Sequence, residues 1–327
     1  MLLREALTTA IDRLAAANVP SPRLNAELLL MFVLGCDRVH LHAHGERPLT
    51  PREAQLYDQA LAKRAGGTPA QYITGHQEFW GLDFIVSPAV LIPRPETEHV
   101  IETVLALIAK SAPSGSAAVR ETSTATGAGR GSKKTDQAPE ASGKEERKKM
   151  VDVGTGSGCI AIALATELPG AEILATDISP AALEIARANA ARHHLQDRIQ
   201  FHETDLLENL EPGNFDFVIS NPPYVAESEE DQVQLEVRKH EPRSAVFAGP
   251  SGVETIQRLI PQARACLKPG GSLVIEISGT IVEGVKRLLT GWEQVQITHD
   301  LQAIPRVVSA RTRGLQDSGH SEPTVET

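Results

Sequence analysis

From residue 150 to residue 311, short apolar runs rich in β-branched residues alternate with helical patterns, and this alternation restricts the possible folds more than any other feature. The runs that predict strands cover residues 150–153, 172–178, 199–204, 215–220, 272–277, 294–298 and 307–311. The main helical patterns cover residues 158–168, 180–194, 253–267 and 281–290. Strands that alternate with helices form a mostly parallel sheet with helices on both faces, which is an α/β fold. Since only a loop separates the last two runs, we expect an antiparallel final strand.

Residues 1–70 have a different pattern, which predicts a small helical bundle. Apolar residues such as Leu3 and Leu14 recur near the 3.6-residue period of a helix. The segment Thr50-Pro51-Arg52-Glu53 supplies a helix N-cap, a proline at the first helical position and an acid at the third. Residues 71–95 then become extended and aromatic, which predicts a β-hairpin that links this bundle to the next domain.

A helical pattern at residues 96–110 belongs, in this interpretation, to the same domain as residues 150–313. Between them, residues 111–149 contain Val119 as their only large apolar residue. Such a segment buries too little surface to offset the entropy of ordering it, so we expect a disordered insertion. Its eight basic and five acidic residues give a net charge of +3, which is typical of a solvated segment. Residues 314–327 are polar and predict a loose C-terminal tail.

Charge and composition exclude several classes of protein. The 32 basic and 42 acidic residues of the 327-residue chain give a net charge of −10, which disfavours binding to phosphate backbones. The longest apolar runs have seven residues, whereas a membrane-spanning helix needs about 20. The N-terminal sequence does not resemble a secretory signal, so we expect a cytoplasmic protein. Cys36, Cys159 and Cys266 are odd in number and widely spaced, which argues against disulfides and against a zinc or other metal site.

A glycine-rich segment connects the first predicted strand of the second domain to the helix that follows it. This segment, Gly154-Thr155-Gly156-Ser157-Gly158, allows a ligand to approach the main chain at a helix N-terminus. Its spacing lacks the wider final interval of the dinucleotide fingerprint, so by itself it is also compatible with a simple tight turn. Asp177 ends the next strand, where a carboxylate accepts hydrogen bonds from both hydroxyls of a ribose. The alternative for Asp177 is a helix N-cap close to Ser179.

The segment Ser220-Asn221-Pro222-Pro223-Tyr224 ends the fourth predicted strand, so it faces the same crevice as the glycine segment. Two consecutive prolines stiffen the main chain, and the carbonyl of Pro222 has no N–H competitor from Pro223. The side chain of Asn221 adds a second acceptor. A rigid pair of acceptors beside an aromatic ring suits a planar NH2 group. The alternative interpretation is a purely structural turn.

These residues together resemble the class I S-adenosylmethionine-dependent methyltransferases, and Asn-Pro-Pro-Tyr resembles the tetrapeptide of those that methylate amide or amino nitrogen. Further motifs narrow the resemblance to the peptide-chain release factor glutamine methyltransferase family. These motifs are Tyr72-Ile73-Thr74-Gly75, Glu78-Phe79-Trp80, Leu91-Ile92-Pro93-Arg94-Pro95-Glu96-Thr97-Glu98 and Val237-Arg238-Lys239-His240-Glu241-Pro242-Arg243-Ser244-Ala245. The resemblance covers residues 1–110 and 150–313, and the family lacks a counterpart of the 111–149 insertion.

The resemblance implies a Rossmann-like domain with a seven-stranded sheet, preceded by a helical domain that docks the substrate. It implies transfer of a methyl group from S-adenosylmethionine to the glutamine amide in the Gly-Gly-Gln motif of class I release factors. Cofactor binding is then expected from Gly154, Thr155, Gly156, Ser157, Gly158, Asp177, Asp205, Leu206 and Asn221. Glutamine binding is expected from Asn221, Pro222, Pro223 and Tyr224, with catalytic roles for Asn221, Pro222 and Tyr224.

Two other functions share some of these features. An adenine-N6 or cytosine-N4 DNA methyltransferase holds an exocyclic amine with a similar tetrapeptide, but it also needs a basic surface and a base-flipping pocket. The only basic excess here lies in the 111–149 insertion. A non-catalytic scaffold built on the same fold is the second alternative. The intact Asn-Pro-Pro-Tyr segment disfavours it, because a scaffold has no need for paired acceptors in the crevice.

Overall fold

The computed structural model describes residues 1–111 and 147–314, and its first part is a helical bundle. The bundle contains α1 (Leu3–Ala16), α2 (Pro22–Leu34), α3 (Arg38–Ala43) and α4 (Pro51–Ala65). Helix α4 starts with a capping box in which the Glu53 amide donates to Thr50 Oγ1 at 3.2 Å and the Thr50 amide donates to Glu53 Oε2 at 2.8 Å. The predicted bundle and this helix start are therefore confirmed.

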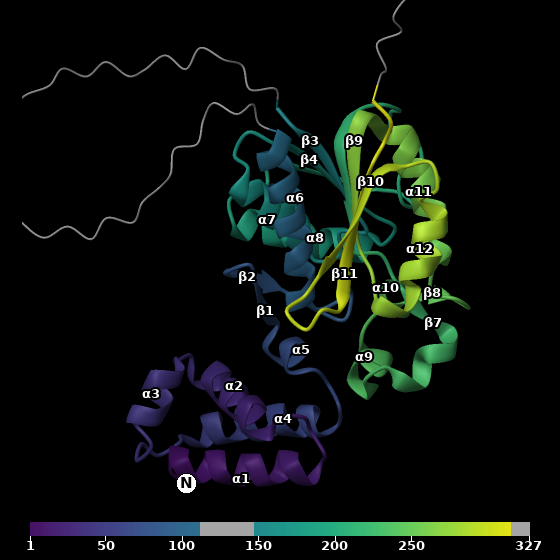
Figure 1. Ribbon diagram of the computed structural model, residues 1–327. Helices are drawn as coiled ribbons and strands as arrows, with labels where there is room; N and C mark the ends of the chain where they lie inside the picture. The colour runs from purple at the N-terminus through teal and green to yellow at the C-terminus, as the bar shows by residue number, and fades with distance from the viewer. Residues whose placement is uncertain (112–146, 315–327) are drawn as a thin grey trace, which may run out of the picture.

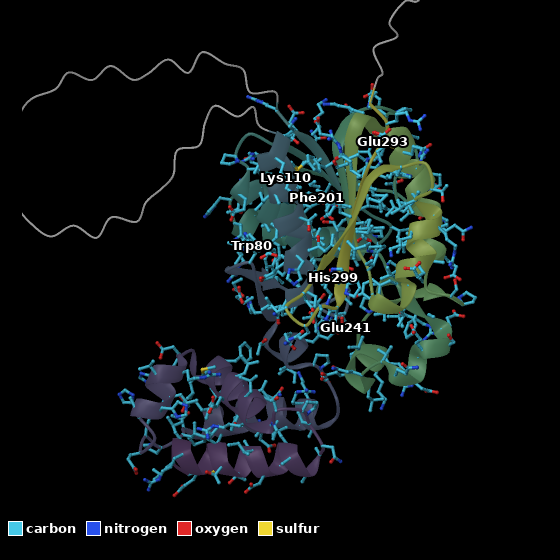
Figure 2. All side chains as sticks on the ribbon, in the orientation of Figure 1. Trp80, Lys110, Phe201, Glu241, Glu293 and His299 are labelled. Carbon is cyan, nitrogen blue, oxygen red and sulfur yellow. The ribbon has the colours of Figure 1, made fainter. Side chains whose placement is uncertain are left out.

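The linker is part helix and part hairpin. Strands β1 (His76–Phe79) and β2 (Leu82–Ile85) form the predicted antiparallel hairpin. The expectation of extended chain from residue 71 is wrong, because α5 (Ala70–Thr74) begins after Pro69 and ends at Gly75, a left-handed C-cap with φ +77°. At the hairpin turn, Trp80 donates from its indole nitrogen to Glu167 Oε1 at 2.9 Å, which holds the hairpin against the second domain (Figure 2).

A seven-stranded sheet forms the centre of the second domain (Figure 1). Its strands are β3 (Lys149–Val153), β4 (Glu172–Asp177), β5 (Ile199–Glu203), β6 (Phe215–Ser220), β9 (Leu267–Glu276), β10 (Glu293–His299) and β11 (Pro305–Arg311). Their order is β10-β11-β9-β6-β3-β4-β5. Strands β3, β4, β5, β6 and β9 pair in parallel, and β11 is antiparallel to both of its neighbours. This confirms the predicted α/β class and the antiparallel final strand.

Helices cover both faces of the sheet (Figure 1). One face packs against α6 (Glu98–Ser111), α7 (Cys159–Glu167) and α8 (Pro180–Arg192), and the other packs against α11 (Glu254–Cys266) and α12 (Val282–Leu288). Consecutive residues of a strand point to opposite faces of the sheet. In β3, Met150 packs in the core on the α6–α8 side and Val151 in the core on the α11–α12 side. Both side chains are at most 1% exposed, which explains why the strands appear in the sequence as continuous apolar runs.

Shorter elements surround the carboxyl edge of the parallel strands. They are the 3₁₀ turns η1 (Pro95–Thr97), η2 (Glu227–Gln232) and η3 (Gly279–Ile281), the helices α9 (Leu235–His240) and α10 (Arg243–Val246), and the paired strands β7 (Val225–Ala226) and β8 (Phe247–Gly249). The sequence analysis missed the β7–β8 pair, because strands of two and three residues carry no periodic signal. These elements surround the loops that hold the predicted site.

Most of the predicted insertion lies outside the described residues, as does the tail after Gly314. Its two edges are regular structure, since Ser111 ends α6 and Lys149 begins β3. All three cysteines have free thiols; Cys159 and Cys266 are buried and Cys36 is partly buried. Within residues 1–111 and 147–314, no helix is long and apolar enough to cross a membrane.

Candidate active site

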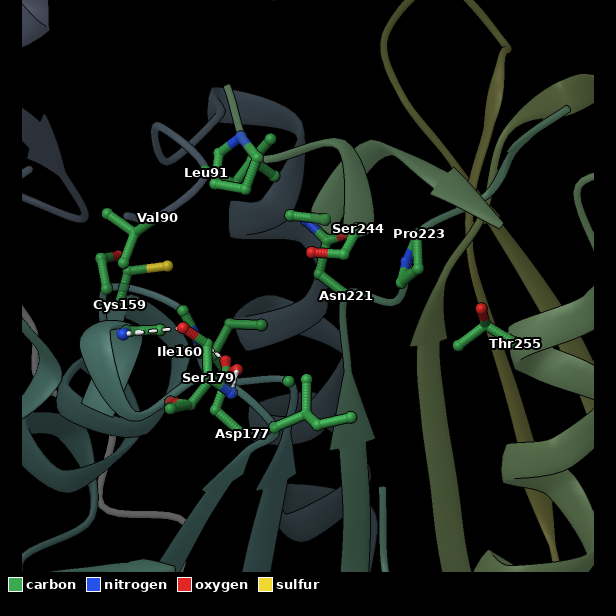
Figure 3. Close-up of a pocket in the computed structure, with 18 of the residues that line it drawn as sticks. Val90, Leu91, Cys159, Ile160, Asp177, Ser179, Asn221, Pro223, Ser244 and Thr255 are labelled. Atoms are coloured by element: carbon green, nitrogen blue, oxygen red, sulfur yellow. Dashed lines mark hydrogen bonds between the residues drawn. The ribbon is translucent and has the colours of Figure 1, made fainter. Parts of the chain in front are cut away.

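A crevice of about 310 Å³ lies at the carboxyl edge of the sheet. Figure 3 shows Asp177 and Ser179 on one side of it and Asn221, Pro223 and Ser244 on another. The predicted site residues that line the crevice are Gly154, Thr155, Gly156, Ser157, Asp177, Asp205, Leu206, Asn221 and Pro223. Three other predicted residues, Gly158, Pro222 and Tyr224, are not among the lining residues but directly adjoin them along the chain. The structure therefore brings together residues from four separate loops.

The glycine loop is held from below by a buried carboxylate. Asp152 Oδ2 accepts hydrogen bonds from Thr155 Oγ1 at 2.6 Å and from the Ala161 amide at 3.2 Å. Burial, helped by the nearby Asp177, raises the pKa of Asp152 to about 7. The hydrogen bonds from Thr155 and Ala161 act in the opposite direction and favour the ionised form. Gly158, at φ +83°, caps α7, and a side chain there would lie 3.2 Å from the Cβ of Ala186. Gly158 therefore allows α7 and α8 to pack closely.

Asp177 is oriented by the main chain of two loops. Its Oδ2 accepts from the Gly156 amide and its Oδ1 from the Ser179 amide, both at 2.9 Å. The N-cap of α8 is Ser179, whose hydroxyl accepts from the Ala182 amide at 3.2 Å, so Asp177 is not needed as a cap. A carboxylate has about four lone-pair sites, so Asp177 can still accept a hydrogen bond from a ligand.

The loop after β5 supplies the next part of the crevice. Leu206 adopts φ +55°, an uncommon conformation for a residue with a side chain, and its carbonyl accepts from Thr176 Oγ1 at 3.0 Å. Asp205 forms an ion pair with Arg258 at 2.6 Å. The loop between β5 and β6 is thus fixed by β4 on one side and by α11 on the other.

The Asn-Pro-Pro-Tyr loop is attached at both ends. Before it, Ser220 Oγ donates to the carbonyl of Val153 at 2.7 Å, which joins it to the glycine loop. Within it, Asn221 Nδ2 donates to Thr97 Oγ1 at 3.0 Å. This bond uses the amide nitrogen, so the amide oxygen Oδ1 is the atom that Asn221 offers to a ligand. Tyr224 donates its hydroxyl to Glu276 Oε1 at 3.0 Å.

The motifs outside the sheet connect the walls of the crevice. Glu241, labelled in Figure 2, forms an ion pair with Arg94 and accepts from the Ile92 amide at 3.2 Å. Glu98 Oε1 accepts from the Trp80 amide at 2.9 Å. These contacts connect η1, the β-hairpin and the segment after the Asn-Pro-Pro-Tyr loop. The motifs that contain Arg94, Glu98 and Glu241 supported the family resemblance, but no role was predicted for these three side chains.

Four residues of the site were missed in the sequence analysis: Asp152, Asn189, Glu276 and Thr97. Asn189 is fully buried; its Nδ2 donates to the Ser157 carbonyl at 2.9 Å and its Oδ1 accepts from the Ile85 amide at 2.7 Å. Asp152 lies two residues before Gly154, the start of the glycine segment, so its position was a usable signal. Asn189 and Glu276 lie in ordinary helical and strand patterns, and Thr97 lies in the quoted segment 91–98, which gave no role for its side chain. The partners of all three are far away along the chain.

Comparison with known proteins agrees with this geometry. Residues 5–75 match the PrmC N-terminal domain, and residues 139–240 match the methyltransferase small domain. The chain is 49% identical over 312 residues to a release factor glutamine methyltransferase of Koribacter versatilis, covering 95% of this chain and 99% of that one. This chain belongs to the release factor glutamine methyltransferase family. A second member, from Chlorobaculum tepidum, is 39% identical over 310 residues, covering 93% of this chain and 95% of that one.

The fold of this family member is also found among solved structures. The catalytic domain of hMettl16 superimposes with a TM-score of 0.50 and 19% sequence identity, covering 79% of this chain and 83% of that one. Together with the sheet order, this identifies the second domain as a class I methyltransferase fold. Its cofactor is S-adenosylmethionine.

The crevice fits S-adenosylmethionine. A Cβ added at Gly154 or Gly156 would have no atom within 4 Å, so there is open space directly above the main chain of this loop. The N-terminus of α7 offers free amide groups to a carboxylate such as that of the methionine part. Asp177 stands at the end of β4, where a ribose is held in related sheets. Asp205 and Leu206 follow on the side expected for adenine.

Proposed function

We propose that this chain transfers the methyl group of S-adenosylmethionine to the side-chain amide nitrogen of the glutamine in the Gly-Gly-Gln motif of class I release factors, and so supports translation termination in the cytoplasm. The observation that carries the proposal is the fixed orientation of Asn221, whose Nδ2 is bonded to Thr97 and whose Oδ1 is left for the crevice. The names of the relatives agree with this substrate.

The chemical difficulty of this reaction is that an amide nitrogen is a poor nucleophile, since its lone pair is delocalised into the carbonyl. In our proposal, Asn221 Oδ1 and the Pro222 carbonyl accept the two hydrogens of the glutamine NH2 group. These two bonds aim the nitrogen at the methyl group and favour its pyramidal form as the new bond develops. Such positioning contributes up to about 7–11 kcal/mol when the reacting atoms are close to the attack geometry.

The charge that develops during transfer has to be stabilised as well. S-adenosylmethionine supplies an electrophilic methyl group on a positively charged sulfur. As the N–CH3 bond forms and the S–CH3 bond breaks, positive charge appears on the amide nitrogen, and the same two acceptors stabilise it. The methylated, protonated amide is acidic and loses its proton to water, so no strong base is required beforehand. Pro223 stiffens the loop, and the ring of Tyr224 would pack beside the amide.

The helical bundle is proposed as the docking domain for the release factor. Helix α2 exposes half or more of Leu24 and Phe32, and a hollow of about 670 Å³ separates this helix from the β-hairpin. Phe32→Ala should raise the KM for intact release factor several-fold and leave the KM for a short Gly-Gly-Gln peptide unchanged. The matched control is Leu56→Ala, since Leu56 is 42% exposed on α4. Equal KM values for release factor in Phe32→Ala and in the control would mean that the bundle only stabilises the fold.

The proposed reaction is tested by tritiated methyl transfer from S-adenosylmethionine to three acceptors in parallel: purified release factor, its Gly-Gly-Gln peptide, and duplex DNA. We expect label on the release factor and the peptide, and none on DNA. Replacing the glutamine of the peptide by asparagine should abolish labelling, because the shorter side chain does not reach the two acceptors. Label on DNA alone would support the DNA methyltransferase alternative, and no label on any acceptor would support the scaffold.

A further inference from the structure

A buried carboxylate lies behind the Asn-Pro-Pro-Tyr loop, and the reaction described above does not use it. Glu276 ends β9 and is 1% exposed. Its Oε1 accepts the hydroxyl of Tyr224 at 3.0 Å, whereas its Oε2 is buried without a hydrogen-bond partner in the described part of the chain. A buried charged oxygen without a partner is costly, so the position of Oε2 requires an explanation.

The neighbour of this oxygen is Thr97, which is also 1% exposed. Its hydroxyl lies beside the Glu276 carboxyl and favours the ionised form. The same hydroxyl oxygen already accepts the hydrogen bond from Asn221 Nδ2 at 3.0 Å. A threonine hydroxyl has a single proton to donate, and the acceptor next to it that lacks a donor is Oε2 of Glu276. Glu276 Oε2 has no hydrogen bond in the described part of the chain, and a small shift of the Thr97 or Glu276 side chain that brings Oγ1 within bonding distance of Oε2 would complete a chain from Asn221 through Thr97 to Glu276.

We propose that Glu276 is a positioning residue that sets the direction of this hydrogen-bond chain and thereby holds Asn221 with Oδ1, not Nδ2, facing the substrate amide. An ionised carboxylate can only accept, so Thr97 must donate to it and must accept from Asn221. The two ends of an asparagine amide have nearly the same shape, and packing alone discriminates poorly between its two orientations. The inference rests on the proposed function, since it concerns the residue that would hold the glutamine.

A reversed Asn221 would prevent the reaction. Its NH2 group would then face the NH2 group of the glutamine, and two donors would meet with no acceptor between them. The glutamine nitrogen would lose one of its two acceptors and with it the alignment toward the methyl group. The S-adenosylmethionine side of the crevice, around Gly156 and Asp177, would stay unchanged. The inference therefore predicts loss of turnover without loss of cofactor affinity.

The surroundings of Glu276 determine how its charge responds to pH. Arg306 of β11 and Glu96 of η1 carry the nearest charges, and the Tyr224 hydroxyl and the Cys159 thiol are the other titratable neighbours. Burial is the largest effect and raises the pKa of Glu276 to about 6. Glu96 acts in the same direction, and the hydroxyls and Arg306 oppose it. Below this pH the carboxyl carries a proton of its own and no longer forces Thr97 to donate.

Glu276→Gln tests the inference with almost no change of shape. We expect kcat for the Gly-Gly-Gln peptide to fall at least tenfold, while the affinity for S-adenosylhomocysteine, measured by calorimetry, stays within twofold. The wild-type kcat should fall as pH decreases through about 6, and this dependence should be absent in the variant. Thr97→Val should reproduce the loss of turnover, and Thr97→Ser, which keeps the hydroxyl, should restore it. Combining Glu276→Gln with Thr97→Val should cost little more than either change alone.

A second readout does not depend on activity. In the NMR spectrum of the protein labelled with ¹⁵N at asparagine, one side-chain amide proton of Asn221 should be protected from exchange in the wild type and exposed in Glu276→Gln. Wild-type protein that labels no glutamine peptide would contradict the proposed function, whereas the NMR result still tests the inference. An active wild type with equal turnover, pH profile and protection in Glu276→Gln would overturn the inference alone. A variant that loses cofactor affinity together with turnover would also overturn it, because Glu276 would then have a general structural role.

Discussion

Asn221→Ala is the substitution that most sharply separates catalysis from cofactor binding. It removes the acceptor Oδ1 from the crevice together with the 3.0 Å bond from Nδ2 to Thr97. Loss of one preorganised polar contact to a developing charge lowers kcat by about 100- to 1000-fold, or about 3–4 kcal/mol. Loss of the bond to Thr97 costs about 1 kcal/mol of unfolding free energy. That amount lowers Tm by about 2–4 °C in a domain of this size, so the variant stays folded in an assay at room temperature.

The assay is steady-state methylation of the Gly-Gly-Gln peptide, combined with calorimetric binding of S-adenosylhomocysteine. Asn214→Ala provides the matched control, because Asn214 precedes the opposite end of β6 and also loses one side-chain bond, to Lys149 at 3.1 Å. We expect kcat to fall in Asn221→Ala and to stay near the wild-type value in Asn214→Ala. The affinity for S-adenosylhomocysteine should stay within about threefold of wild type in both variants, because a ribose-binding carboxylate and a glycine loop dominate cofactor binding. Wild-type turnover in Asn221→Ala would refute the proposed role of the amide.

Three further predictions concern the cofactor side and the support of the site. Asp177→Ala should weaken S-adenosylhomocysteine binding at least tenfold by calorimetry, whereas Glu172→Ala, at the exposed start of the same strand, should not. Gly252→Ala should lower Tm and turnover together, because Gly252 has φ +82° and an added Cβ would lie 2.8 Å from the carbonyl oxygen of Tyr224. Gly170→Ala, where an added Cβ would have no atom within 4 Å, should leave both quantities unchanged. Burial raises the pKa of Asp152 to about 7, so the native state binds the proton more tightly and the unfolding free energy should fall as pH rises from about 4 to about 7. Urea denaturation of Asp152→Asn should lack this decrease, and an equal pH dependence in wild type and variant would contradict the assignment.

The sheet could be predicted from the sequence because its strands are buried on both faces. In β6, Phe217 and Ile219 belong to one core and Val218 between them to the other, so the centre of the strand is a continuous apolar run. The short pair β7–β8 escaped prediction, since its pairing depends on Val225 meeting Phe247 in space. The helix at Ala70–Thr74 escaped it for a different reason. Five residues between a proline and a glycine show no helical period, and their aromatic content favoured an extended interpretation.

In the site, too, local sequence patterns could be predicted and contacts between distant residues could not. Asp177 and Asn221 each stand at the end of a predicted strand, so a rule about parallel sheets places them at one edge. Thr97 and Glu276 act through partners that lie 124 and 52 residues away, and no local pattern reports such contacts. Tyr224, predicted to contact the glutamine, is not among the residues that line the crevice, and its hydroxyl donates to Glu276. Sequence patterns thus indicated nine of the residues that line the crevice, whereas the residues that hold them in place depend on tertiary contacts.

The central claim is that Asn221 Oδ1 and the Pro222 carbonyl accept hydrogen bonds from the glutamine amide and hold it opposite the methyl donor. A crystal structure with S-adenosylhomocysteine and a Gly-Gly-Gln peptide measures this directly. We predict that the glutamine Nε2 lies within hydrogen-bond distance of both Asn221 Oδ1 and the Pro222 carbonyl, and that it faces the sulfur of S-adenosylhomocysteine. A glutamine bound elsewhere, or an Asn221 amide turned away from it, would contradict the account.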